Sequence, residues 1–108
     1  MTVKVENLFG NIPYDIPEEI IQVLFQNKKI KIERIISRGH ASEEGFWYDQ
    51  EQDEFVILLK GNAELKFFNE NEPIILNPGD YIIIKAHQKH RIVRTANDQE
   101  TIWLTVFF

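Results

Sequence analysis

The strongest constraint on the fold is a series of short apolar segments that recur about every ten residues. After residue 29, apolar residues alternate with polar ones or form short continuous runs, and turn-forming residues separate the segments. Strands at this spacing are typical of an all-β sandwich or barrel. The expected strands span residues 29–37, 46–48, 54–60, 63–68, 73–76, 81–85, 90–95 and 101–108.

One turn and the strand after it indicate where a site could lie. Pro78 fixes φ at the first turn position, and Gly79 accepts the positive φ that the next position needs. Residues 81–84 then form an apolar run that predicts a strand buried on both faces. His87 and His90 follow at its end. We therefore expect His90 at the mouth of whatever the strands enclose, where a barrel holds a ligand or a metal.

The segment at residues 16–27 predicts the one helix of the chain. Asp15 can cap it, Glu18 stands at the capping-box spacing, and Pro17 falls within the first turn. The apolar residues share one helical face: Ile20, Ile21, Leu24 and Phe25. We expect residues 1–29 to form an N-terminal segment with this short helix packed on a barrel of residues 30–108.

Composition excludes several classes of function. The net charge of −5, with no basic cluster, argues against a nucleic-acid partner. The absence of cysteine excludes disulfides, iron–sulfur clusters and thiolate zinc sites. No apolar run is long enough for a signal peptide or a membrane span, so we expect a cytoplasmic protein with no membrane partner.

Two stretches resemble the motifs of the cupin superfamily. Glu54, six further residues and Gly61 match the end of its first motif, whereas Gly79 and His90 match the glycine and the histidine of its second. The chain is most similar to the small single-domain conserved-barrel (cupin type-2) proteins, with a degenerate first motif. The resemblance implies a small antiparallel double-stranded β-helix, or jelly-roll barrel, over about residues 30–108.

The resemblance also implies a metal site with gaps in it. Cupins usually bind one Fe, Mn, Ni, Zn or Cu ion through two histidines, a glutamate and a later histidine. Glu54 and His90 stand at the last two positions, but Tyr48 and Gln50 replace the two histidines, or Trp47 and Asp49 by the alternative spacing. Tyrosine and glutamine are poorer ligands than imidazole for such ions. The expected metal ligands are thus Glu54, His90 and Gln50, for Fe, Mn, Ni or Zn, although a metal-free site is equally compatible.

The same positions supply the expected contacts to a small-molecule ligand: Tyr48, Gln50, Glu54, Trp47 and His87. Each has a structural alternative. A buried Glu54 needs a partner and could pair with Arg34 or Arg94. His90 could donate a hydrogen bond to a backbone carbonyl, and the aromatic residues could simply fill the barrel wall. No residue is assigned a catalytic role from the sequence.

Three classes of function are compatible with these residues. The first, which we expect, is a metal-binding cupin with dioxygenase, isomerase or lyase chemistry on an unidentified small molecule. The second, which is the main alternative, is a metal-free barrel that binds or senses a small molecule without catalysis. The third is metal-free acid–base catalysis with a histidine base and a tyrosine acid. We expect a homodimer in each case, because residues 101–108 are apolar at nearly every position and one face of that strand needs a cover.

Overall fold

Eight β-strands make up the fold of residues 2–108. A computed structural model describes residues 2–108, and that part of the chain contains no helix. The strands are β1 (Ile20–Gln26), β2 (Lys31–Ser37), β3 (Glu54–Lys60), β4 (Ala63–Phe67), β5 (Ile74–Leu76), β6 (Tyr81–Ile84), β7 (His90–Thr95) and β8 (Thr101–Phe107).

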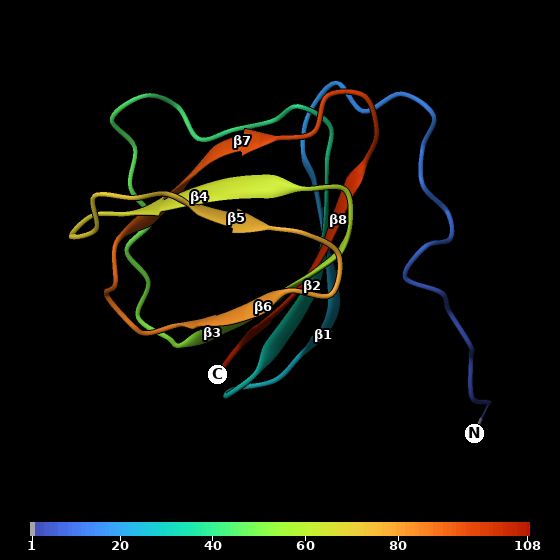
Figure 1. Cartoon of the computed structure of the whole chain (residues 1–108). Coiled ribbons are helices and arrows are strands. Elements are labelled where there is room, and N and C mark those ends of the chain that lie inside the picture. The colour runs from blue at the N-terminus through green and yellow to red at the C-terminus, as the bar shows by residue number, and fades with distance from the viewer. Residues whose placement is uncertain (1) are drawn as a thin grey trace.

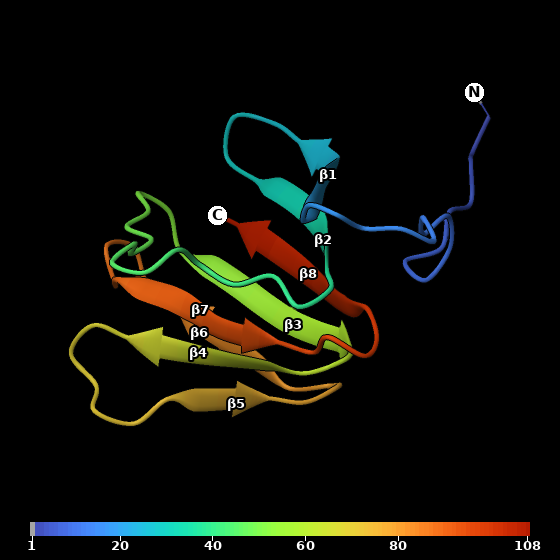
Figure 2. The same cartoon turned by 90° about the horizontal axis from the view of Figure 1, so that it is seen from above.

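The strands form two antiparallel sheets. The larger sheet has the order β1-β2-β8-β3-β6, and the smaller has the order β5-β4-β7. Figure 1 shows the two sheets facing each other as the walls of a flattened barrel. In Figure 2, β1 and β2 lie at the end of the larger sheet that is farthest from β4 and β5. The architecture is the all-β double-stranded barrel expected from the strand spacing.

The hydrophobic core lies between the two sheets. Strand residues of one parity point inward, as the alternating burial of β3 and β4 shows. The buried cluster comprises Val56, Leu58, Ala63, Leu65, Phe67, Leu76, Ile84 and Trp103. Because β3, β4 and β8 supply most of it, these strands hold the inward-facing positions in a rigid frame.

The predicted helix at residues 16–27 is wrong, because that segment contains β1. β1 pairs antiparallel with β2, from Ile20 opposite Ile36 to Gln26 opposite Lys31. Its β-branched residues disfavour a helix and suit a strand, and the pairing with β2 outweighs the capping pattern. β1 thus joins part of the segment 1–29 to the barrel as one sheet.

A turn around Asn27 explains why the helical reading fails at its end. The Asn27 side-chain oxygen accepts hydrogen bonds from the backbone N–H groups of Lys29 (2.9 Å) and Ile30 (2.8 Å). Such a turn reverses the chain between two strands.

Two other expectations also fail. The strand expected at residues 46–48 is reduced to one bridge between Tyr48 and His90. β6 is an edge strand in which Tyr81 and Ile83 are exposed, so it is not buried on both faces.

Arg34 fixes the N-terminal segment to the outer face of β2. Its Nη1 donates to the backbone carbonyls of Leu8 (3.0 Å) and Gly10 (2.7 Å), and its Nε donates to the Gln22 side chain (2.6 Å). Arg34 lies opposite Leu104 of β8 in register. Residues 8–10 are therefore held on the side of the sheet that carries Leu104.

The hairpin between β3 and β4 depends on Gly61. Its φ is +85°, and a Cβ there would lie 2.7 Å from the Cα of Thr101 and 2.8 Å from the carbonyl oxygen of Glu100. We predict that Gly61→Ala lowers the free energy of unfolding by about 3 kcal/mol, since backbone strain adds to a clash with main chain that cannot move aside. Urea unfolding measures this change.

Gly45→Ala is the matched control. Gly45 has a φ of +81°, but no heavy atom lies within 4 Å of the Cβ position. That substitution should lower the free energy of unfolding by about 1 kcal/mol, from the backbone conformation alone. Equal losses in the two variants would show that the contact with Thr101 and Glu100 is unimportant.

The homodimer expected from the sequence stays a prediction, and β1 is the surface that we expect it to use. β1 is an edge strand of the larger sheet, and Val23, Leu24 and Phe25 are about half exposed. Unpaired edges with apolar side chains favour strand association. Light scattering at micromolar concentration should therefore give about twice the chain mass of 12.8 kDa.

Phe25→Glu should return the mass to that of one chain, because it places a charge at the expected interface. Phe68→Glu is the control: Phe68 is 55% exposed, against 53% for Phe25, but lies outside β1. A wild-type mass near 12.8 kDa, or a shift caused equally by both variants, would contradict the prediction.

Candidate functional site

A cavity of about 120 Å³ opens between the two sheets. Its lining is mainly apolar and is supplied by every strand except β5, by the loop before β3 and by Glu19, which precedes β1. The polar lining residues are Glu19, Glu33, Tyr48, Gln50, Glu54, His90 and Thr105. The fold therefore gathers most of the chemically active residues of the barrel interior around one small space.

Glu54 and His90 form the centre of the site. Glu54 begins β3 and shares the inward parity of Val56, while His90 begins β7 on the opposite sheet. The two side chains are almost fully buried, at 6% and 5% exposed, and His90 Nε2 lies 3.8 Å from Glu54 Oε1. A small movement would bring the two atoms within hydrogen-bond distance.

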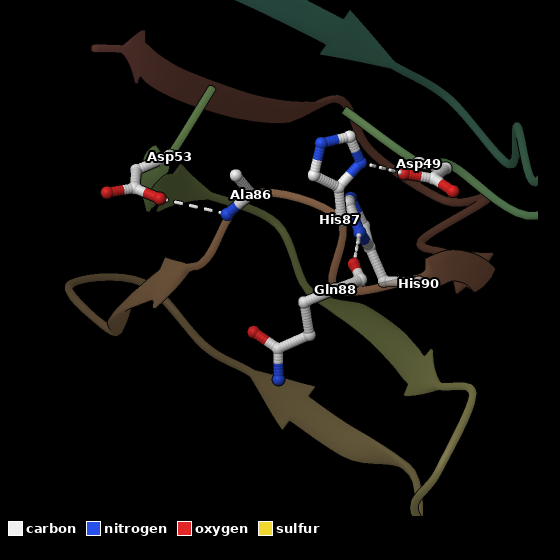
Figure 3. Close-up of polar contacts among 6 residues, drawn as sticks. All are labelled: Asp49, Asp53, Ala86, His87, Gln88 and His90. Atoms are coloured by element: carbon white, nitrogen blue, oxygen red, sulfur yellow. Dashed lines mark hydrogen bonds and ion pairs between the residues drawn. The ribbon is translucent and has the colours of Figure 1, made fainter. Parts of the chain in front are cut away.

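The orientation of the His90 ring is fixed from its other side. Nδ1 donates a hydrogen bond to the backbone carbonyl of Gln88 at 2.9 Å, as Figure 3 shows. The ring also stacks on Tyr48, with centroids 5.4 Å apart, and contacts Phe67. Nε2 is then the free nitrogen that faces Glu54. Burial lowers the pKa of His90, although the bond to Gln88 partly opposes this effect, so the neutral ring is favoured.

Burial has the opposite effect on the carboxyl of Glu54. It raises the pKa of Glu54 to about 7; the Gln50 side chain lowers this pKa through a hydrogen bond, and the charge of Glu33 raises it. A carboxyl with this pKa is partly protonated at neutral pH. Glu54 and the neutral imidazole can therefore share one proton.

Tyr48 is held beside this pair by the backbone. Its N–H donates to the carbonyl of His90 at 2.7 Å, and its own carbonyl accepts from the His90 N–H at 3.2 Å. Burial, and then the charges of Glu19 and Glu54, raise the pKa of the phenol. The raised pKa keeps the Tyr48 phenol neutral, which disfavours a phenolate ligand for a metal ion.

His87 and Trp47 do not line the cavity. His87 lies on the exposed loop after β6 with a φ of +63°, and its Nδ1 is 2.7 Å from Asp49 Oδ1 (Figure 3). Trp47 packs edge-on against Phe68 and beneath the guanidinium of Arg91. The structure thus brings together Tyr48, Gln50, Glu54 and His90, but places these two residues elsewhere.

Neither arginine that could have neutralised Glu54 contacts it. Arg34 bonds to the N-terminal segment on the outer face of the sheet, and Arg94 Nη1 donates to the Asn62 side chain at 2.8 Å. Within residues 2–108, the basic group paired with Glu54 is His90. The carboxyl is buried without a strong cation, which accounts for its raised pKa.

Three cavity residues were missed from the sequence. Glu33 is buried and its carboxylate lies 3.3 Å from Lys31 Nζ, while Glu19 accepts a hydrogen bond from Ser37 Oγ at 2.7 Å. Thr105 lies opposite Glu33 in register on β8. Thr105 stands between Leu104 and Val106, and a polar residue inside such an apolar strand is the signal that could have identified it. Glu19 and Glu33 have charged neighbours, so the sequence carries no such signal for them.

The donor set does not make a complete transition-metal site. Glu54 and His90 are the two strong donors, and Gln50 adds an amide oxygen, which such ions bind weakly. Among residues 2–108, no group of three or more His, Cys, Asp and Glu side chains is arranged to hold a metal ion. The metal implied by the resemblance is therefore not matched by the ligands on this chain.

Comparison with known proteins identifies the family. A model of the cupin domain matches residues 35–107, which include the whole of β3 to β8 and the end of β2. The chain belongs to the cupin family. No curated protein sequence matches this cupin.

Solved structures agree with this assignment. The chain is 43% identical to a protein from Ralstonia eutropha JMP134 that carries a provisional name as a mannose-6-phosphate isomerase; the match covers 97% of each chain with a TM-score of 0.93. A cupin superfamily protein from Desulfitobacterium hafniense DCB-2 is 19% identical, with 90% of this chain and 83% of that chain covered and a TM-score of 0.73.

A third match has a double-stranded β-helix fold. It is an RmlC-like cupin family protein from Methanocaldococcus jannaschii, 17% identical over 99% of this chain and 91% of that chain, with a TM-score of 0.71. At this identity the last two matches show the fold alone.

Within residues 2–108 there is no helix of the length and hydropathy that crossing a membrane requires.

The raised pKa of Glu54 predicts an unusual pH dependence of stability. From its ordinary value of 4.5 up to about 7, the folded state binds more protons at Glu54 than the unfolded chain does. Its contribution to stability therefore decreases as the pH rises through this window, by about 3 kcal/mol at most. The lowered pKa of His90 acts in the opposite sense, with stability lost as the pH falls below 6.5.

Glu54→Gln separates the two effects, because it removes one titration and leaves the other. The difference in unfolding free energy between this variant and the wild type should change between pH 4.5 and 7. Carbon-13 NMR of the Glu54 side-chain carboxyl should show a midpoint near neutral pH. A midpoint near 4.5, with a stability difference independent of pH, would contradict the prediction.

Proposed function

We propose that this cupin binds a small molecule in the cavity and transfers a proton on it, with Glu54 and His90 as an acid–base pair. The observation that carries the proposal is the approach of His90 Nε2 to Glu54 Oε1, at 3.8 Å, inside a mainly apolar cavity. Acid–base catalysis needs one group that can donate a proton and one that can accept it near the working pH. Burial raises the pKa of Glu54 to about 7, and it lowers the pKa of His90, which keeps that ring neutral and able to accept a proton.

The environments of the two groups suggest different roles. His90 is held as the neutral ring with Nε2 free, so it can accept a proton from a carbon atom next to a carbonyl group. Glu54 carries a proton for part of the time at neutral pH and can donate it to the carbonyl oxygen. When the first carbon carries a hydroxyl group, the product is an enediol, with His90 protonated and Glu54 ionised. His90 then gives its proton to the former carbonyl carbon while the Glu54 carboxylate takes the proton of the other enediol hydroxyl, which completes an isomerisation and restores both groups. Tyr48 and Gln50 would orient the molecule through hydrogen bonds.

The similarity to the Ralstonia protein supports this class of reaction. The two chains are 43% identical over almost their full lengths, and the name of that protein is the name of an isomerase. The name belongs to that protein. For this chain we take from it the isomerase type of chemistry alone and not the substrate.

A second candidate is a bound divalent ion (Fe, Mn, Ni or Zn) held by Glu54, His90 and Gln50. The orientation of His90 favours it, because a ring fixed through Nδ1 to a carbonyl presents Nε2 as metal-binding histidines do. The small number of strong ligands disfavours a bound ion, because no three His, Cys, Asp or Glu side chains of residues 2–108 are grouped to hold one. A barrel that binds a small molecule without catalysis is the remaining alternative, and it needs the same cavity but no proton transfer.

The test is hydrogen exchange into a simple carbonyl compound. In deuterium oxide, the wild-type protein should speed the uptake of deuterium by dihydroxyacetone, as followed by proton NMR. Glu54→Gln and His90→Gln should each reduce the rate by about 100-fold or more. His87→Gln is the matched control, because His87 lies outside the cavity and should leave the rate unchanged.

Metal dependence is separated by two measurements on protein purified without an affinity tag. Elemental analysis should find less than one ion per chain, and exchange should persist after treatment with a chelator. Loss of exchange with the chelator and recovery with one added ion would favour the metal-binding alternative. Exchange equal to that of the buffer, for wild type and variants alike, would exclude the proposed proton transfer on this compound.

A further inference from the structure

The inference concerns the ligand that the cavity selects, and it rests on the proposed function. Three carboxylate side chains line the cavity, Glu19, Glu33 and Glu54, and no lysine or arginine of residues 2–108 is among the lining residues. Sites that recognise phosphate or carboxylate groups use cationic side chains or clusters of backbone N–H groups. The charges around this cavity are of the opposite sign.

The partners of these three carboxylates do not change the negative sign of the charge around the cavity. Lys31 Nζ lies 3.3 Å from the Glu33 carboxylate, but the Lys31 side chain is on the solvent side of the pair and is far more exposed than that of Glu33. Glu19 is paired with a neutral hydroxyl, that of Ser37, and Glu54 with a neutral imidazole. A negatively charged ligand would therefore meet an excess of carboxylates in a poorly hydrated space, where like charges repel strongly.

A buried hydroxyl group in the cavity wall, that of Thr105, lacks a hydrogen-bond partner within residues 2–108. Thr105 is 1% exposed and lines the cavity, and its Oγ1 has no hydrogen-bond partner among the described residues. Buried polar groups are almost always paired, by protein, water or ligand. Thr105 lies opposite Glu33 in register, so a hydroxyl and a carboxylate stand side by side on the inner face of the larger sheet.

These observations define the hydrogen-bonding character of the ligand. The carboxylate of Glu33 can only accept hydrogen bonds, whereas the hydroxyls of Thr105 and Tyr48 can donate or accept. A ligand hydroxyl group satisfies both kinds of partner, because it too donates and accepts. The cavity volume of about 120 Å³ is below the range of pockets for drug-sized ligands, so the bound molecule is small.

We propose that the cavity selects an uncharged, hydroxyl-rich molecule, such as a short sugar or polyol, and rejects its phosphate esters, with Thr105 and Glu33 as specificity-determining residues. The substrate class of this chain then differs from the phosphorylated sugar in the name of the Ralstonia protein. Glu54 and His90 keep the roles given above, on an unphosphorylated substrate.

The test compares pairs of compounds that differ by one phosphate group. Dihydroxyacetone is compared with dihydroxyacetone phosphate, and mannose with mannose 6-phosphate. The indole N–H of Trp103 is the reporter, because Trp103 lines the cavity and donates to Ser37 Oγ. Its NMR resonance should shift with at least one neutral compound, and the phosphorylated member of that pair should bind at least tenfold more weakly.

Two variants test the named residues. Thr105→Val removes the unpaired hydroxyl at nearly constant side-chain volume, so the free energy of unfolding should stay equal or rise. The affinity for the neutral compound should decrease by about three- to tenfold. Glu33→Gln should reduce the discrimination between the members of a pair. If Thr105 is merely a core residue, Thr105→Val will leave binding unchanged, and the specificity role is overturned.

The outcomes are distinct from those of the proposed function. Tighter binding of a phosphorylated compound would overturn the inference on ligand class but leave proton transfer by Glu54 and His90 intact. The absence of a Trp103 shift with all four compounds would also overturn the assignment to sugars or polyols. Failure of the proton transfer would be seen separately, as normal binding of a neutral compound without deuterium exchange.

Discussion

The burial of Glu54 without a lysine or arginine partner is the constraint on which the rest of the site depends. A carboxyl group in this position must either be protonated or share charge with the one basic group close to it, the imidazole of His90. The two shifts in pKa follow from the same removal of water. The chemistry of the site is therefore a consequence of where the barrel places one inward-facing strand residue.

The barrel architecture provides that position. Antiparallel pairing between β3 and β8 sets Glu54 opposite Phe107, and alternation then directs Val56 and Leu58 into the core. His90 comes from the other sheet, so the pair bridges the two walls of the barrel. Because both residues begin their strands, they lie at the open end, where the core gives way to the cavity.

The cavity combines features that would be destabilising in an ordinary core. Three carboxyl groups and an unpaired threonine hydroxyl are costly to bury. Apolar residues of similar size would fill the same space at a smaller cost in folding free energy. Stability is supplied by the buried apolar cluster that adjoins the cavity, in which Leu65 and Trp103 also line the cavity wall and Leu58 does not. This division of the interior into a packed part and a polar part is typical of proteins that bind a ligand in a barrel.

Local sequence determined most of the architecture, because strand periodicity and turn residues act over short distances. The seven strands from residue 31 onward could be read from it. The resemblance to the cupin motifs, and not strand periodicity, brought Glu54 into the candidate site beside His90. The prediction from local sequence was wrong at residues 16–27, where a capping pattern suggested a helix. Only pairing with β2 decided that this segment is a strand, since edge pairing is a long-range interaction that propensity does not contain. Tertiary structure alone also decided that Glu33 and Thr105 share a wall with Glu54, that both arginines turn away, and that His87 lies outside. Those contacts join residues far apart in the chain, and strand register and the direction of each side chain determine them.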